Sequence, residues 1–112
     1  MNQYNEKHIN NFSKQELEKL GAQGQLIDVR TQEEFELAHI NGATLHPVDK
    51  IESFNKDKNT TYFVHCKSGT RSAKASEYLA EQGYDIVNLD GGYKAYEAKN
   101  DDDNTFEENT NV

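Results

Sequence analysis

Short apolar runs alternate along the chain with longer stretches of helix-like pattern, and no internal repeat is present. Such runs, rich in branched aliphatic and aromatic residues, are typical of buried strands. The four predicted strands cover residues 26–29, 43–46, 61–65 and 86–89. Because helices separate the strands, the pattern predicts an α/β domain with a mainly parallel central sheet flanked by helices.

Two of the predicted helices begin with a capping box. In this motif the N-cap hydroxyl group accepts from the backbone N–H of the glutamate three residues later, and the side chain of that glutamate accepts from the backbone N–H of the N-cap residue. The boxes are Ser13-x-x-Glu16 and Thr31-x-x-Glu34. Gly21 is predicted to end the first helix, and Phe35 is predicted to face the core from the second. A weaker helical segment is expected over residues 51–54.

The clearest helical pattern covers residues 72–82, with Gly83 at the position after its end. Small and apolar residues recur there at three- and four-residue spacing, which predicts a face that packs closely against the sheet. These residues are Ala75, Ser76, Leu79 and Ala80. A closing helix over residues 93–99 follows the turn Asp90-Gly91-Gly92.

The length of 112 residues suits one domain, which we place at residues 1–99. Residues 100–112 contain five acidic residues and no lysine or arginine, so they contribute −5 of the net charge of −8. We expect this acidic tail to be disordered, because it has too little apolar surface to offset the entropy of ordering.

Composition also limits the expected partners and location. A net charge of −8 disfavours nucleic acid and anionic membranes, which bind basic surfaces. No apolar run approaches the ~18 residues of a membrane span, and the start of the chain lacks a secretory-signal pattern, so a soluble cytoplasmic protein is expected. The lone cysteine cannot form an internal disulfide, and an exposed reactive thiol persists best in a reducing compartment.

That cysteine, Cys66, opens the loop Cys-Lys-Ser-Gly-Thr-Arg over residues 66–71, between a predicted strand and a predicted helix. A side chain at this place faces unpaired backbone N–H donors of the helix start. Since the loop lacks proline, each residue keeps its donor, and Gly69 lets the chain curl, so the loop should bind anions. Lys67 and Arg71 add positive charge, which favours the thiolate.

The spacing within this loop separates two kinds of chemistry. Cysteine-dependent phosphatases place five residues between the cysteine and the arginine, whereas four lie between Cys66 and Arg71. The shorter ring suits one sulfur atom carried on the cysteine better than it suits a phosphoryl group.

The loop resembles that of the rhodanese family, and further motifs across residues 5–98 occur in rhodanese order and spacing. They are Leu26-Ile27-Asp28-Val29-Arg30, Glu34-Phe35, Ala38-His39-Ile40-Asn41-Gly42-Ala43, Pro47, Arg71-Ser72, Gly83-Tyr84 and Leu89-Asp90-Gly91-Gly92. Ala38 departs from a glycine common in the family, and Tyr96 from a tryptophan. The resemblance implies a three-layer rhodanese-like fold and a single-domain sulfurtransferase.

The resemblance further implies that Cys66 is the catalytic nucleophile and carries sulfane sulfur as a persulfide. The substrate-binding residues are then Lys67, Ser68, Gly69, Thr70 and Arg71. Two roles stay open: the hydroxyl groups of Ser68 and Thr70 either shape the loop or donate to the bound sulfur, and Arg71 either binds anions and organises the loop or only pairs with a carboxylate.

Other polar residues have simpler expected roles. Asp28, Arg30 and Glu34 are interpreted as scaffold, with Arg30 and Glu34 spaced to pair with each other. His65 should not act as a base for Cys66, because adjacent strand residues point to opposite faces of a sheet. No metal site and no cofactor are expected, since no ligand pair has zinc-site spacing.

Three functions are compatible with these features. The first is a thiosulfate or persulfide sulfurtransferase, whose partners are a small sulfur donor, a thiol or cyanide acceptor and, in a relay, a second sulfur-carrying protein. The second is a non-catalytic rhodanese-like interaction or sulfur-sensing module. The third, a phosphatase or arsenate reductase, is disfavoured by the loop length.

Overall fold

A computed structural model describes residues 3–100, in which five strands form one sheet in the order β1-β5-β4-β2-β3. All four strand pairings are parallel. The strands are β1 (Asn5–His8), β2 (Leu26–Asp28), β3 (Thr44–Leu45), β4 (Thr61–His65) and β5 (Asp85–Asp90). The α/β fold with a parallel central sheet is therefore confirmed.

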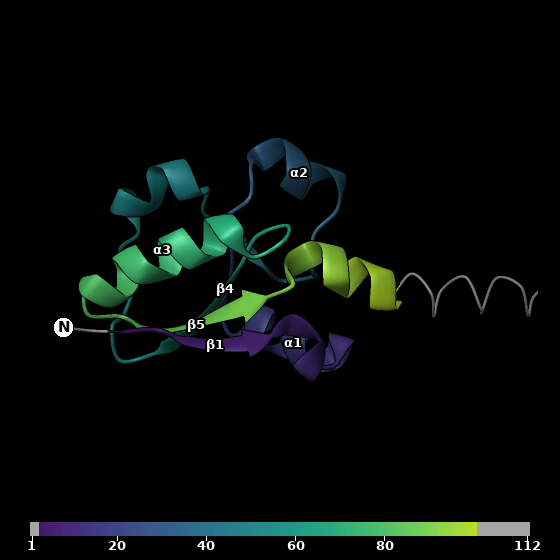
Figure 1. The fold of residues 1–112 in the computed structure, drawn as a ribbon, viewed down its shortest axis with the longest axis horizontal. Coiled ribbons are helices and arrows are strands. Elements are labelled where there is room, and N and C mark those ends of the chain that lie inside the picture. The colour runs from purple at the N-terminus through teal and green to yellow at the C-terminus, as the bar shows by residue number, and fades with distance from the viewer. Residues whose placement is uncertain (1–2, 101–112) are drawn as a thin grey trace, which may run out of the picture.

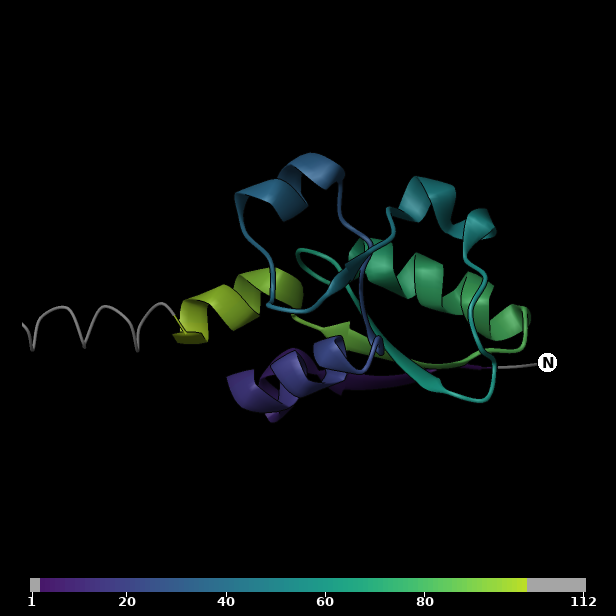
Figure 2. The same cartoon turned by 180° about the vertical axis from the view of Figure 1, so that it is seen from behind.

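Helical segments lie on both sides of this sheet (Figure 1). They are α1 (Lys14–Ala22), α2 (Gln32–Leu37), α3 (Thr70–Glu81), the 3-10 segments η1 (Ile9–Asn11) and η2 (Val48–Ser53), and a helix over residues 92–100. In the view from behind, α1 again lies across the sheet from α3 and η2 (Figure 2). This arrangement gives the three layers that the motif resemblance implies.

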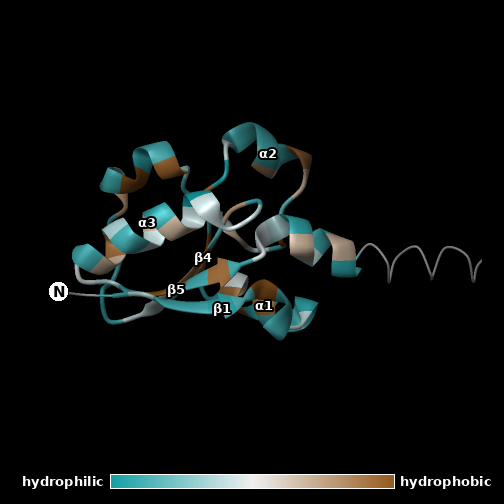
Figure 3. Ribbon diagram, viewed as in Figure 1, coloured by the Kyte–Doolittle hydropathy of each residue, from teal (hydrophilic) through white to brown (hydrophobic). Residues whose placement is uncertain are grey.

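Alternation along the strands divides the core into two clusters. Ile27, Val64 and Ile86 pack with α3 and η2, whereas Leu26 and Val87 belong to the cluster that contains Leu17 of α1. Successive side chains of a strand point to opposite faces, so β2, β4 and β5 each contribute to both clusters. In Figure 3, hydrophobic residues colour parts of the ribbons of β4 and β5, which lie between α3 and α1.

The edge strand β1 was not predicted from the sequence. Its four residues, Asn5–His8, are polar and exposed, so they carry no apolar pattern. The strand forms because its backbone pairs in parallel with β5, with Asn5 opposite Val87 and His8 opposite Asp90. Only the position of the neighbouring strand reveals it.

The prediction that Gly21 ends the first helix is wrong. Helix α1 continues through Ala22, and Gly21 is buried inside it. A Cβ atom at Gly21 would lie 2.8 Å from the backbone carbon of Gly42, so the glycine permits a close approach of helix and turn. Gly24, with φ of 75°, carries the chain away from the helix instead.

The prediction that Phe35 faces the core is also wrong. Helix α2 has no buried residue, and Phe35 is half-buried with its ring stacked on His39 at a centroid distance of 3.7 Å. The helix begins at the predicted capping box but sits over the edge of the sheet rather than over its centre (Figure 1).

Helix α3 confirms the predicted small-residue face, because Ala75, Ser76, Leu79 and Ala80 are all buried. The helix begins at Thr70 rather than residue 72, since Gly69 adopts a left-handed conformation with φ of 118° and serves as the N-cap. Residues 51–53 of the helical segment expected over residues 51–54 belong to the 3-10 segment η2, and Phe54 is its C-cap. The predicted disordered tail lies outside the described residues, apart from residue 100 at the end of the last helix.

Within residues 3–100, none of the helices combines the length and the apolarity that crossing a membrane requires.

Candidate functional site

Strand β4 delivers Cys66 to the edge of the sheet formed by the carboxyl ends of the strands. Asp28, the last residue of β2, pairs with His65 there. Asp90, the last residue of β5, is close enough that its Oδ1 would lie 2.9 Å from a Cβ atom placed on Gly69. The prediction that Cys66, Asp28 and Asp90 share one edge is confirmed.

The loop after Cys66 forms a set of hydrogen-bond donors around its sulfur. The backbone N–H of Gly69 donates to Sγ over 3.1 Å. Burial raises the pKa of the Cys66 thiol, but hydrogen bonds from the Ser72 hydroxyl and from the backbone N–H groups of Ser72, Gly69 and Ser68 more than offset this, so the pKa lies below its usual value. The loop therefore favours the thiolate through its hydrogen-bond donors, and the predicted contribution of Lys67 and Arg71 is not among the causes of the lowered pKa.

Ser72 is a residue of this site that the sequence reasoning did not assign. Its side chain is fully buried, and the single proton of its hydroxyl donates either to the sulfur or to the carbonyl oxygen of Gly69, which lies 3.1 Å away. The sequence feature that could have identified Ser72 is its position directly after Arg71, in the first turn of α3. A side chain three residues after Gly69 lies on the same face of the helix as Gly69 and therefore beside the loop.

The expectation of an exposed thiol is wrong for this structure. Cys66 is only 1% exposed and belongs to the same buried cluster as Val64 and Ala75. The reason is strand alternation, which turns Cys66 toward the α3 side of the sheet together with Val64. The thiol thus lies under its own loop rather than at the surface.

A glycine turn after β5 holds the outer side of the loop. The backbone N–H of Tyr93 donates to the carbonyl oxygen of Cys66 over 2.8 Å. The backbone N–H of Lys94 donates to the carbonyl oxygen of Lys67 over 2.9 Å. A Cβ atom on Gly92 would lie 2.5 Å from the Lys67 oxygen and 2.6 Å from the Cys66 oxygen. These bonds keep two loop carbonyls outside the ring while the N–H groups face the sulfur.

Arg71 pairs with a carboxylate on another element, which was the second of its two open roles. Its Nη1 and Nη2 donate to the two carboxylate oxygens of Glu34 over 2.7 and 3.0 Å. The same hydrogen bonds to Arg71 lower the pKa of Glu34 to about 2. Arg71 therefore ties the start of α3 to α2.

The predicted pairing of Arg30 with Glu34 is wrong. Arg30 instead donates to both carboxylate oxygens of Asp28, with its Nη2 2.8 Å from Oδ2, and both side chains are buried. Its Nη2 also donates to the carbonyl oxygen of Ala38. The buried carboxylate of Asp28 provides a closer partner than the exposed face of α2.

His65 is fully buried beside this ion pair. Its Nδ1 lies 3.1 Å from the carbonyl oxygen of Cys66, and its Nε2 lies 3.7 Å from Oδ2 of Asp28. Burial lowers the pKa of His65, which favours the neutral ring. The contact is with the Cys66 backbone, so the ring supports the strand end rather than the sulfur.

The outer residues of the loop are exposed. Lys67, Ser68 and Thr70 face solvent, and the structure shows no hydrogen bond from the hydroxyl of Ser68 or Thr70 to the sulfur. Ser68 contributes through its backbone N–H. Among residues 3–100, no group of three or more His, Cys, Asp or Glu side chains is placed to hold a metal ion.

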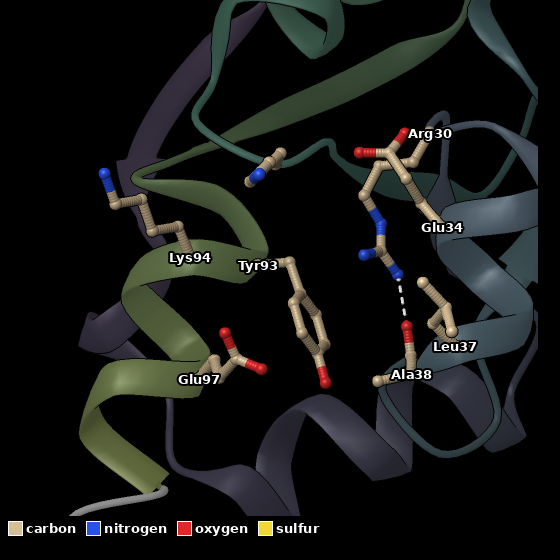
Figure 4. Close-up of a pocket in the computed structure, with 8 residues that line it drawn as sticks. Arg30, Glu34, Leu37, Ala38, Tyr93, Lys94 and Glu97 are labelled. Atoms are coloured by element: carbon tan, nitrogen blue, oxygen red, sulfur yellow. Dashed lines mark hydrogen bonds between the residues drawn. The ribbon is translucent and has the colours of Figure 1, made fainter.

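A pocket of about 400 Å³ adjoins the loop at Lys67 (Figure 4). Its walls come from the end of β2, from α2 and from the helix over residues 92–100. The lining residues are Arg30, Glu34, Leu37, Ala38, Lys67, Tyr93, Lys94 and Glu97. The guanidinium carbon of Arg30 lies 4.4 Å from the centre of the Tyr93 ring, and Leu37 on the rim is 88% exposed.

Comparison with known proteins agrees with the motifs. The family model "Rhodanese-like domain" matches residues 13–99. The thiosulfate sulfurtransferase PspE of Escherichia coli is 39% identical over 72 residues, which are 61% of this chain and 69% of PspE. The putative sulfurtransferase YtwF of Bacillus subtilis is 39% identical over 80 residues, or 66% of this chain and 74% of YtwF.

Solved structures of similar proteins show the same architecture. A rhodanese-like domain protein from Staphylococcus aureus is 41% identical, with a TM-score of 0.61 over 74% of this chain and 86% of its own. Some relatives are far longer, and the chain spans only 16% of the Bacillus anthracis CoADR-RHD chain. With a family model that covers most of its length, the chain belongs to the rhodanese-like domain family.

Proposed function

We propose that the protein is a sulfurtransferase that carries sulfane sulfur as a persulfide on Cys66. The observation that carries this proposal is the short loop whose N–H groups surround Sγ, with the Gly69 nitrogen 3.1 Å away. Preorganised donors stabilise negative charge on sulfur in both the thiolate and the persulfide. The names of PspE and YtwF support the same activity.

In the first half-reaction, the Cys66 thiolate attacks the outer sulfur of thiosulfate. A new S–S bond forms to Cys66 as the old S–S bond breaks, and sulfite leaves with the bonding electron pair. A persulfide donor reacts in the same way and leaves as a thiolate. Exposed Lys67 attracts the anionic donor, while Arg71, already paired with Glu34, organises the loop.

In the second half-reaction, an acceptor thiolate or cyanide attacks the outer sulfur of the Cys66 persulfide. The Cys66–sulfur bond breaks, and its electron pair returns the cysteine to the thiolate. The chain contains a single cysteine, so the acceptor has to be external. This sequence of steps is a double displacement.

The burial of Cys66 adds a requirement to this mechanism. At 1% exposure, Sγ cannot meet a donor in line unless the loop over residues 67–69 moves aside. The side chains of Lys67 and Ser68 are exposed and lose no core packing in such a movement, whereas Gly69 is buried and has to leave its place beside the sulfur. We therefore expect donor attack to be limited by opening of this loop.

Intact-mass analysis tests the proposal directly. Incubation with thiosulfate or glutathione persulfide should add one sulfur atom to the wild-type protein and none to Cys66→Ser, and subsequent cyanide should release thiocyanate. If several donors leave the mass unchanged while the protein stays folded, the assignment of sulfur transfer to Cys66 is wrong.

The buried thiol also favours one alternative, a rhodanese-like module that senses sulfur species or docks a partner without turnover. The observation is again the 1% exposure of Cys66. Such a module would form the persulfide slowly and would not pass the sulfur to cyanide. Single-turnover and steady-state rates of the same preparation separate the two, because an enzyme regenerates the free thiolate.

A further inference from the structure

His65, the last residue of β4, is a fully buried titratable side chain that the proposed sulfur transfer does not use. Its ring lies between two hydrogen-bond acceptors. Nδ1 is 3.1 Å from the carbonyl oxygen of Cys66, and Nε2 is 3.7 Å from Oδ2 of Asp28. The backbone N–H of Val29 donates to the carbonyl oxygen of His65 over 3.0 Å, which fixes the strand end that bears the ring.

The surroundings of the ring determine which nitrogen carries the proton. A carbonyl oxygen only accepts, so the contact with Cys66 is a hydrogen bond when Nδ1 is protonated. Nε2 lies too far from Asp28 for a hydrogen bond, and Arg30 already donates to both carboxylate oxygens of Asp28. Burial lowers the pKa of His65, which keeps the ring neutral. The neutral ring therefore has its one proton on Nδ1, directed at Cys66.

Packing alone does not account for a histidine at this position. Nε2 of His65 is buried and has no hydrogen-bond partner among residues 3–100. A buried nitrogen without a partner destabilises the folded protein. A leucine of similar size would avoid that cost, so what the histidine adds is the Nδ1–H donor to Cys66.

The carbonyl group of Cys66 links the ring to the sulfur. Its oxygen accepts from Nδ1 of His65 and, over 2.8 Å, from the backbone N–H of Tyr93. The C=O and N–H of a trans peptide point in opposite directions, so fixing this oxygen also fixes the direction of the next N–H. The chain then continues to Ser68 and Gly69, whose N–H groups lower the pKa of Cys66. Both donors also compensate the partial negative charge of an oxygen that belongs to the same residue as the thiolate.

We propose that His65 is a positioning residue for the sulfur of Cys66. Through the bond from Nδ1–H to the Cys66 carbonyl, the neutral ring holds the first peptide of the loop, so that the following N–H groups converge on the sulfur. His65 neither touches the sulfur nor supplies a proton to the reaction. The kinetic consequence of this role rests on the proposed function, whereas its effect on the thiol does not.

Two substitutions separate the hydrogen bond from the packing of the ring. In His65→Asn, the amide nitrogen takes the place of Nδ1 and keeps the donor, but much of the ring volume is lost. In His65→Leu, the volume is kept and the donor is lost. With a positioning role, the pH profile of Cys66 alkylation moves to higher pH in His65→Leu and less in His65→Asn. If the ring only fills space, His65→Asn is the less stable variant in urea and neither profile moves.

His39→Leu is the matched control. Nδ1 of His39 lies 2.7 Å from the carbonyl oxygen of Phe35, so this variant loses the same type of contact at an exposed position after α2. Its alkylation profile should remain that of the wild-type protein. An unchanged profile in folded His65→Leu, or an equal shift in both His65 variants, overturns the inference.

The wild-type protein provides a test that does not depend on the folding of a variant. NMR of the ring nitrogens at neutral pH should show His65 with a proton on Nδ1 and none on Nε2. A proton on Nε2 instead overturns the inference, because Nδ1 then has nothing to donate to the Cys66 carbonyl.

Kinetics connect the positioning role to the proposed function. Below the midpoint of the wild-type alkylation profile, kcat/KM for thiosulfate should fall about threefold or more in His65→Leu, the factor that one hydrogen bond supplies, and fall less in His65→Asn. Wild-type kcat/KM in His65→Leu at that pH overturns the positioning role. A shifted alkylation profile with no turnover even in the wild-type protein contradicts the proposed function and leaves the role of His65 at the thiol standing.

Discussion

Replacement of Gly92 with alanine tests whether the glycine turn shapes the sulfur-binding loop. In the structure, the added Cβ atom would lie 2.5 Å from the Lys67 oxygen and 2.6 Å from the Cys66 oxygen. Because both contacts are with backbone, the loop has to shift, and we expect an overpacking penalty of about 1–3 kcal/mol. The φ of 60° at Gly92 adds about 1–2 kcal/mol of left-handed backbone strain.

Gly24→Ala is a matched control for this backbone term. Gly24 has φ of 75°, and nothing lies within 4 Å of an added Cβ atom. The free energy of unfolding of Gly24→Ala should therefore fall only by the backbone strain, about 1–2 kcal/mol. Urea unfolding of the two variants measures the difference, which we assign to the contact with the loop.

The chemical readout is the pKa of the Cys66 thiol. In Gly92→Ala, displaced carbonyls of Cys66 and Lys67 weaken the N–H arrangement at the sulfur, so the pKa should rise toward its ordinary value. The pH dependence of thiolate absorbance and of alkylation rate reports it. If Gly92→Ala is no less stable than Gly24→Ala and titrates like wild type, the turn does not position the loop.

Three further outcomes follow from the structure. Ser72→Ala should raise the pKa of Cys66 by removing a hydroxyl donor, and an unchanged alkylation profile would refute that role. Because its pKa falls from 4.5 to about 2 on folding, Glu34 stabilises the protein above pH 4.5, and this contribution disappears as the pH falls toward 2. Glu34→Gln should then cost about 1–2 kcal/mol at pH 7, after allowance for solvent screening, and reduce the acid sensitivity of urea unfolding, whereas an unaltered pH slope would contradict the pairing with Arg71. Leu79→Ala should cost about 2–5 kcal/mol, because the side chain is fully buried between α3 and the sheet, and a loss below 1 kcal/mol would show that the core refills the space.

Local signals in the sequence predicted most of the helices and strands and some of their boundaries. Strand β4 begins and ends as predicted, and the capping boxes at Ser13 and Thr31 start α1 and α2. The Cys66 loop was also predictable, because a strand, a loop with donors and a helix follow one another within a few residues. Such features depend on neighbours in the chain, which a single sequence displays.

Contacts between distant segments were decided only by the tertiary structure. Polar β1 is a strand because β5 lies beside it, and Gly21 stays helical because the backbone of Gly42 approaches it. Arg71 pairs with Glu34 for a similar reason, since the fold brings the start of α3 within reach of α2.

The burial of the Cys66 thiol also depends on contacts between distant segments. The residue pattern alone predicts that Cys66 follows a buried strand and precedes a loop of N–H donors. Only the packing of α3 on the sheet decided that the sulfur is covered, and only the last helix closed the pocket beside it. Burial and pocket shape depend on distances between elements far apart in the chain, and no local pattern of residue types encodes those distances.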